Sequence, residues 1–127
     1  MIVVDTSALL AVILNQTAGR GCKEALAAES QVTISAGTLA EALLVASRRG
    51  VRTELESLVG QLGLEVEPVS AASAARVADA YGRWGRGAGT AGLNFGDCFA
   101  YEAAKTRGCP LLYVGDDFAK TDIGSVL

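Results

Sequence analysis

The stretch Ile2-Val3-Val4-Asp5-Thr6-Ser7 decides the fold that we predict for this chain. Its three β-branched residues follow one another without polar alternation, which is typical of a strand buried on both faces of a parallel sheet. Asp5 ends the run and is a suitable N-cap for the helix that we predict over residues 8–15. A buried strand that leads directly into a helix indicates an α/β fold.

The rest of the chain repeats this alternation of strands and helices. Further strands are predicted at residues 31–34, 64–69 and 111–114. Further helices are predicted at residues 22–28, 38–49, 52–61, 70–84 and from Asn94 or Gly96 to 106. The third strand alternates, with Leu64 and Val66 expected to face inward. We therefore expect an α/β fold in one domain, residues 1–127, with a mainly parallel sheet of four or five strands flanked by helices.

The composition limits the chemistry that the protein can perform. Half of the 127 residues are apolar and only 20% are charged, which argues against a disordered chain. Histidine is absent, so Ser-His and Cys-His nucleophile pairs and His-ligated zinc are excluded. The three cysteines have no C-x-x-C spacing and indicate neither a disulfide framework nor a structural zinc site. Catalysis must then depend on carboxylates, on a metal that they hold, or on backbone dipoles.

The N-terminus and the apolar runs bear on where the protein is located. No basic segment precedes Ile2–Val4, so we expect no signal peptide. The longest apolar run, residues 8–14, is too short to cross a bilayer. We expect a soluble, cytoplasmic protein with free thiols and no membrane contact.

Several acids fall at equivalent places in the predicted fold. Asp5 follows the first strand, and Asp116 and Asp117 follow the fourth, whereas Glu41 and Asp97 lie in the first turns of predicted helices. The carboxyl ends of parallel strands meet at one edge of the sheet, where ligands bind. Carboxylates brought together there would repel one another unless a hard cation such as Mg²⁺ or Mn²⁺ were present.

Each of these acids also has an ordinary structural explanation. Asp5 can cap a helix, residues 38–41 form a capping box, and Asp97 occupies a third helical position where a carboxylate is favourable. Residues 115–117, with the sequence Gly-Asp-Asp, are of the types that commonly form turns. Capping does not explain why all of the acids should gather at one edge of the sheet.

Together, these motifs resemble the PIN-domain ribonucleases, and among them the VapC-type toxins of bacterial toxin–antitoxin pairs. The resemblance covers the chain from Met1 to about Ile123. It is carried by these segments: Asp5-Thr6-Ser7, the helix with Glu41, Leu93-Asn94-Phe95-Gly96-Asp97-Cys98, and Gly115-Asp116-Asp117-Phe118. The resemblance implies endonucleolytic cleavage of RNA that depends on Mg²⁺ or Mn²⁺.

The resemblance also implies roles for single residues. The expected metal ligands are Asp5, Glu41, Asp97 and Asp116. Asp117 is the alternative for the fourth acid. Thr6 and Ser7 match hydroxyl positions that orient a metal-bound water or the first carboxylate. Without histidine, we expect a metal-activated water to be the nucleophile.

Any RNA must be bound by the basic residues, which are a minority of the charged residues in this chain. Arg83-Trp84-Gly85-Arg86, beside the glycine-rich stretch 85–92, supplies two guanidinium groups and an aromatic plane. We interpret that stretch as a mobile loop, and Lys105 and Arg107 as a solvated helix end. The net charge of -3 argues against a nucleic-acid ligand only at first sight, because setting five of the 14 acids aside leaves nine against 11 bases.

Partners follow from the resemblance as well. It implies a homodimer and a cognate VapB-type antitoxin whose C-terminal segment lies near the acidic site. The alternative function is a catalytically silent PIN-like domain that only binds RNA or a protein. Retention of all the acids argues against that alternative.

Overall fold

A computed structural model describes residues 1–89 and 91–127. Four strands form one sheet in the order β3-β2-β1-β4, and all three pairings are parallel. The strands are β1 (Ile2–Val4), β2 (Val32–Ser35), β3 (Glu65–Glu67) and β4 (Leu111–Leu112). The helices are α1 (Thr6–Ile13), α2 (Gly19–Ala28), α3 (Ala36–Arg48), α4 (Arg52–Leu62), α5 (Ala71–Trp84), α6 (Phe95–Arg107) and the short 3₁₀ helix η1 (Phe118–Lys120). The predicted α/β architecture with a parallel sheet is confirmed.

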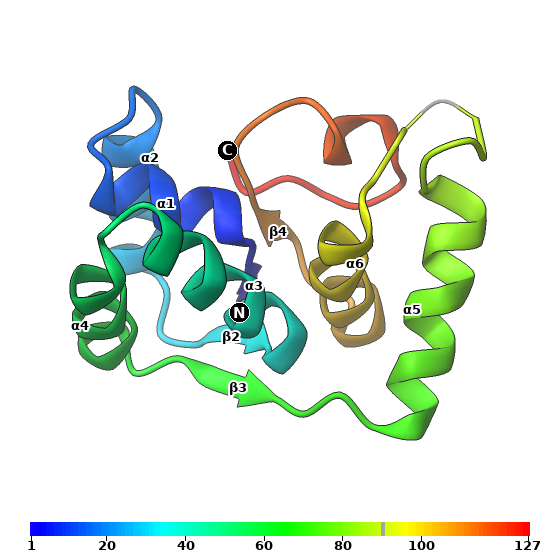
Figure 1. Cartoon of the computed structure of the whole chain (residues 1–127), viewed down its shortest axis with the longest axis horizontal. Coiled ribbons are helices and arrows are strands. Elements are labelled where there is room, and N and C mark those ends of the chain that lie inside the picture. Colours follow the sequence, from blue (N-terminus) through cyan, green and yellow to red (C-terminus); the bar gives the residue numbers. More distant parts are fainter. Residues whose placement is uncertain (90) are drawn as a thin grey trace.

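The first strand explains the layered arrangement. Ile2 and Val4 belong to a core shared with α1, α2, α3 and α4, whereas Val3 belongs to a second core formed with α5 and α6. All three residues are buried, as expected for a strand covered on both faces. Figure 1 shows α1 to α4 grouped on one side of the molecule and α5 and α6 on the other.

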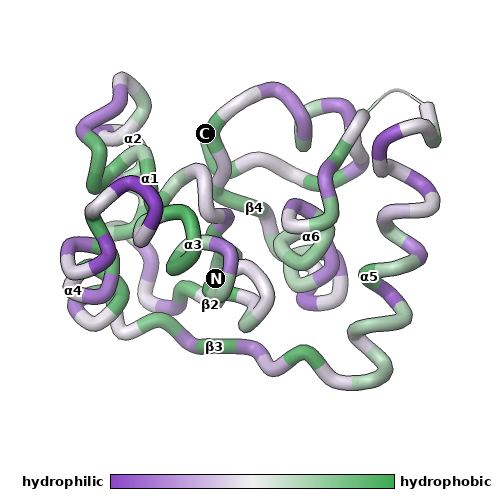
Figure 2. The backbone as a smooth tube through the Cα atoms, in the orientation of Figure 1, coloured by the Kyte–Doolittle hydropathy of each residue, from purple (hydrophilic) through white to green (hydrophobic). Residues whose placement is uncertain are grey.

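Apolar residues follow this arrangement along the chain. In Figure 2 hydrophobic and hydrophilic residues alternate along α5, as expected for a helix with one buried face. Its buried residues include Val77 and Ala80. None of the described helices is both long and apolar enough to cross a membrane.

Two strand predictions are too long. β3 covers only Glu65–Glu67, and Val66 is 43% exposed, so the prediction that it faces inward is wrong. The reason is that β3 lies at the edge of the sheet and pairs with β2 alone. β4 is also shorter than the predicted strand over residues 111–114.

The glycine-rich stretch connects α5 to α6. Its ends meet through hydrogen bonds between backbone atoms, from Leu93 N to the Trp84 oxygen at 2.9 Å and from Arg86 N to the Leu93 oxygen at 3.2 Å. Thr90 lies outside the described residues, and the mobility of this loop stays a prediction. The connection places the C-terminus of α5 close to the N-terminus of α6.

Candidate active site

Asp5 lies at the carboxyl end of β1 and caps α1, as predicted. Its side chain is 3% exposed. The Oδ2 atom accepts hydrogen bonds from the Ser7 backbone nitrogen (3.0 Å) and the Ser7 hydroxyl (2.6 Å). That hydroxyl in turn accepts a hydrogen bond from Val114 N at 3.0 Å, which ties the site to the chain after β4. The Oδ1 atom is buried without a hydrogen-bond partner in the described structure.

Burial changes the acidity of Asp5. It raises the pKa of this carboxyl from 3.8 to about 6, and the hydrogen bonds from Ser7 offset only part of the effect. The charges of Asp97 and Glu41 raise this pKa further. A buried oxygen without a donor, in a carboxyl that resists ionisation, marks a place where a cation would be stabilising.

Glu41 lies in the second turn of α3 because this helix begins at Ala36. The predicted capping box over residues 38–41 is therefore wrong: the N-cap is Ser35, whose side chain accepts a hydrogen bond from Gly37 N. Helix capping thus gives no reason for a glutamate at this position. Glu41 Oε1 instead accepts a hydrogen bond from Thr6 Oγ1 at 2.8 Å. Thr6 therefore holds Glu41, and Ser7 holds Asp5.

Asp97 lies in the first turn of α6, where it forms a capping box with Asn94. Its Oδ2 accepts a hydrogen bond from Asn94 N at 3.0 Å, and Asn94 Oδ1 accepts one from Asp97 N at 2.8 Å. Partial burial raises the pKa of Asp97, and the charges of Glu41 and Asp117 raise it further. Asp97 therefore caps the helix, as its structural explanation predicted. Its charge also interacts with those of Asp5, Glu41 and Asp117, and we call these four residues the acidic cluster.

The turn after β4 carries the two candidates for the fourth acid. Asp116 and Asp117 are both exposed and directly precede η1. Of the two, it is Asp117 whose charge raises the pKa of Asp97. Asp116 stays the predicted fourth acid and Asp117 the alternative.

The acidic cluster is not a preformed metal cage. Among the described residues, no three acids or cysteines are close enough together to hold an ion. The donor set nevertheless fits Mg²⁺ or Mn²⁺, because every candidate ligand is a carboxylate oxygen. The unpartnered Oδ1 of Asp5 is the specific observation that supports this fit.

The predicted RNA-binding motif separates into two parts. The Arg83 guanidinium lies over the Trp84 ring, 4.6 Å from its centroid, and 3.7 Å from the Asp122 carboxylate. Trp84 Nε1 donates a hydrogen bond to the Tyr101 hydroxyl at 3.1 Å. Arg83 and Trp84 line a cavity of about 230 Å³ between α5 and α6. Only Arg86 acts on the acidic cluster, since its charge lowers the pKa of Asp97.

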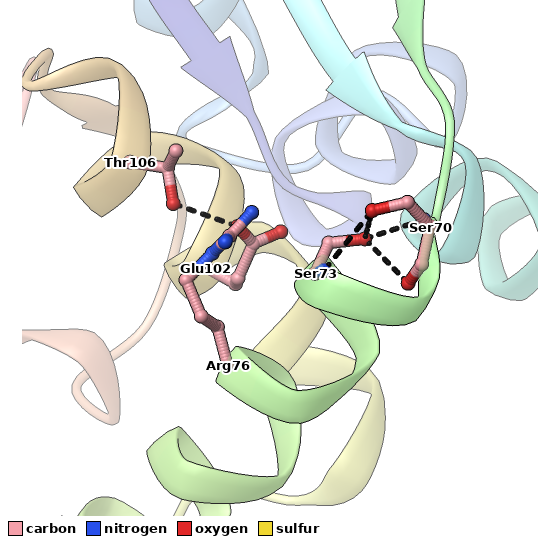
Figure 3. A network of polar contacts seen from close by, with 5 residues as sticks. All are labelled: Ser70, Ser73, Arg76, Glu102 and Thr106. Atoms are coloured by element: carbon pink, nitrogen blue, oxygen red, sulfur yellow. Dashed lines mark hydrogen bonds and ion pairs between the residues drawn. The ribbon is translucent and has the colours of Figure 1, made fainter.

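A second polar cluster joins α5 to α6, and sequence reasoning missed it. Glu102 is only 7% exposed. It pairs with Arg76 at 3.1 Å and accepts a hydrogen bond from Thr106 Oγ1 at 2.7 Å, as Figure 3 shows. The opposite charges of Arg76 on α5 and Glu102 on α6 could have suggested such a pairing, but nothing in the sequence aligns the two helices.

The basic residues near the end of α6 are bound within the molecule. Lys105 Nζ lies 2.9 Å from Asp122 Oδ2, and Arg107 pairs with Glu65 and Glu67 of β3. The interpretation as a solvated helix end fits Lys105, which is 52% exposed, but not Arg107, which is 20% exposed and paired with β3.

Comparison with known proteins agrees with this architecture. A family model described as the PIN domain matches residues 2–124. The chain is 40% identical over 126 residues to Ribonuclease VapC42 of Mycobacterium tuberculosis, covering 95% of each protein.

Two solved structures have the same fold. The crystal structure of VapC20 from Mycobacterium tuberculosis, described as a toxin that cleaves the sarcin–ricin loop, superposes with a TM-score of 0.81 at 19% identity and covers 99% of this chain and 98% of that one. A toxin–antitoxin complex from Klebsiella pneumoniae gives a TM-score of 0.70 at 19% identity and covers 96% and 93% of the two chains. With a family model over nearly its whole length and relatives at this level of identity, the protein belongs to the PIN-domain family, among its VapC ribonucleases.

Proposed function

We propose that this chain, as one domain over residues 1–127, is the toxin of a toxin–antitoxin pair and a divalent-metal-dependent endoribonuclease that acts in the cytoplasm. The observation that carries the proposal is the buried carboxyl of Asp5, whose Oδ1 has no hydrogen-bond donor among the described residues and whose pKa is raised to about 6. A purely structural helix cap would be solvated or fully hydrogen-bonded. The name of the relative VapC42, a ribonuclease, supports the same assignment.

The residues that would hold Mg²⁺ or Mn²⁺ are Asp5, Glu41, Asp97 and Asp116, with Asp117 as the alternative fourth acid. When bound, such an ion would polarise the phosphodiester and make water acidic enough to attack at neutral pH, which suits a chain without histidine.

The protein's own hydroxyls and amides orient these acids. Thr6 fixes one oxygen of Glu41, Ser7 fixes one oxygen of Asp5, and the Asn94 backbone fixes one oxygen of Asp97. Each carboxylate is thus held through one oxygen, which leaves the second oxygen as a candidate ligand. Side chains that are held before the substrate arrives have less conformational freedom to lose during the reaction.

RNA would be bound by basic residues beside this cluster. Arg86 is the candidate for the phosphate nearest the acids, because its charge acts on Asp97. Arg83 and Trp84 form a cation–aromatic pair further along α5 and would contact a flanking nucleotide.

Two protein partners complete the proposal. A VapB-type antitoxin is expected because a fold neighbour is a toxin–antitoxin complex. A homodimer is expected from the family, and two exposed apolar side chains support it: Phe95 on α6 is 62% exposed and Leu44 on α3 is 51% exposed. Both residues lie on helices that contact each other, and exposed apolar side chains that adjoin on a surface are typical of protein interfaces.

The test is RNA cleavage by the purified chain. We expect cleavage in Mg²⁺ or Mn²⁺, loss of cleavage in EDTA, and recovery when the metal is restored. Expression in bacteria should arrest growth, and Asp5→Ala should relieve the arrest, whereas Glu54→Gln on the exposed face of α4 should not. Cleavage that persists in EDTA would contradict the proposal.

A further inference from the structure

The contact between α3 and α6 contains two glycines that each accommodate a side chain of the other helix. A Cβ atom on Gly96 of α6 would overlap one carboxylate oxygen of Glu41 and would lie 2.6 Å from its Cδ. A Cβ on Gly37 of α3 would overlap the Phe99 ring and would lie 2.8 Å from Cε1. Neither glycine has a positive φ, so it is space, and not backbone conformation, that requires glycine here.

The two contacts are reciprocal. Gly37 and Glu41 lie about one turn apart on α3, and Gly96 and Phe99 lie about one turn apart on α6. Phe99 also packs edge-on against Phe95, with ring centroids 4.9 Å apart. The two helices therefore fit together in one register, with Phe99 of α6 against α3 and Glu41 of α3 against α6.

This register determines where the Glu41 carboxylate lies. Thr6 holds Oε1 at 2.8 Å, and Oε2 lies against Gly96, the residue directly before Asp97. The missing side chain of Gly96 is what allows a glutamate on α3 to come beside an aspartate on α6. A methyl group on residue 96 would push the Glu41 carboxylate out of its present position. The carboxylate could not move away without disturbing the hydrogen bond that its Oε1 accepts from Thr6.

We infer that Gly96 is a positioning residue that sets the approach of Glu41 to Asp97, an inference that rests on the proposed metal-dependent function. It acts through Glu41 and touches no reacting group. Gly96→Ala should therefore move the Glu41 side chain, whereas a Gly→Ala change at a helical position with open space around it should move no neighbouring side chain. Gly60 in α4 provides the matched control, because a Cβ there would meet nothing within 4 Å.

The first measurement uses thermal unfolding without metal or RNA. Alanine is the better helix former, so Gly60→Ala should raise Tm. Gly96→Ala should lower Tm in the chain that has Glu41 and raise it in a Glu41→Ala background, where the clash is absent. The same sign in both backgrounds would overturn the inferred contact, whether or not the protein is a nuclease.

The second measurement is Mn²⁺ affinity by titration calorimetry, followed by RNA cleavage. We expect Gly96→Ala to weaken Mn²⁺ binding by at least about tenfold, comparable to the loss of a residue that orients a ligand. In the Glu41→Ala background the same change should have no further effect on affinity. Unchanged affinity in Gly96→Ala, or an equal loss in both backgrounds, would overturn the positioning role. Failure of the unmodified chain to bind Mn²⁺ would overturn the positioning role and the proposed function together, while leaving the sign reversal in Tm as a separate result.

Discussion

Helix α6 contacts α3 near its N-terminus and α5 along its other side, and carboxylates lie at both contacts. On the α5 side, Asp122 receives hydrogen bonds from Tyr101 at 2.6 Å and Lys105 at 2.9 Å, and these donors lower its pKa. On the α3 side, the pKa values of Asp5 and Asp97 are raised. The same helix thus borders one carboxylate that is neutralised by ion pairs and a second group of carboxylates that form no ion pair among the described residues. We attribute the first cluster to stabilisation of the fold and propose that the second binds a cation.

The largest expected effect comes from removing one acid of the α3 side. Asp97→Asn should lower RNA cleavage by at least about 100-fold, since even residues that only orient metal ligands are worth 10- to 100-fold. Asp122→Asn, the matched change on the α5 side, should leave cleavage within a few-fold of the unmodified chain. Initial rates on a defined RNA would measure both. Equal losses in the two variants would remove the distinction between the clusters.

A pH-dependent loss of stability should arise from Asp5 in the metal-free protein. Because the pKa of Asp5 is about 6 when folded and 3.8 ordinarily, the folded state binds more protons between those values. The free energy of unfolding should therefore fall as pH rises through this window, by about 3 kcal/mol at most.

Asp5→Asn should remove this pH dependence and stabilise the metal-free protein at pH 7, while abolishing cleavage. Urea unfolding at pH 4.5 and pH 7 in EDTA would measure the effect. A variant that is less stable than the unmodified chain at pH 7 would contradict the account, because it would show that ionised Asp5 is satisfied within the fold.

Removal of a carboxylate on the α5 side should have the opposite effect on stability. Glu102→Ala leaves Arg76 and Thr106 without their partner and should lower the free energy of unfolding by about 2 kcal/mol. Metal affinity should be unchanged. Chemical unfolding together with calorimetry would test both parts, and a change in Mn²⁺ affinity would show that the two clusters are not independent.

The smallest expected effect separates the two halves of the basic motif. Arg86→Ala should raise KM for RNA by about threefold to tenfold and reduce its dependence on salt, as the loss of one phosphate contact would. Arg83→Ala should change KM less, because Arg83 is engaged with Trp84 and Asp122. KM measured at two salt concentrations would distinguish them, and a larger effect from Arg83 would place the RNA along α5 instead.

The sequence predicted the features that depend on local pattern. Ile2–Val4 has the composition of a strand buried on both faces, and Ser70 and Asn94 are recognisable helix caps, so β1 and the starts of α5 and α6 were correctly predicted. The expectation that Asp5, Glu41 and Asp97 converge depended on the parallel order of the strands, and the charges of Glu41 and Asp97 do act on Asp5.

The features that were missed depend on how elements pack against each other. Whether Ser35 or a later residue caps α3 depends on where β2 ends, and the exposure of Val66 depends on the edge position of β3. The pairing of Glu102 with Arg76 can be predicted only when the register between two helices that are separated by a loop is known. The close approach of Glu41 to Gly96 likewise cannot be predicted without knowing where α3 lies relative to α6.

Our central proposal is that the carboxylates on the α3 side of α6, which form no ion pair among the described residues, bind a divalent cation. The most direct test is the shift in Tm on adding Mg²⁺ at pH 7 to the unmodified chain, to Asp97→Asn and to Asp122→Asn. A ligand at 100 times its Kd stabilises a folded protein by about 2.7 kcal/mol, so we expect a rise of several degrees in the unmodified chain. Asp122→Asn should show the same rise and Asp97→Asn almost none. An equal rise in Asp97→Asn, or no rise in the unmodified chain, would contradict the account.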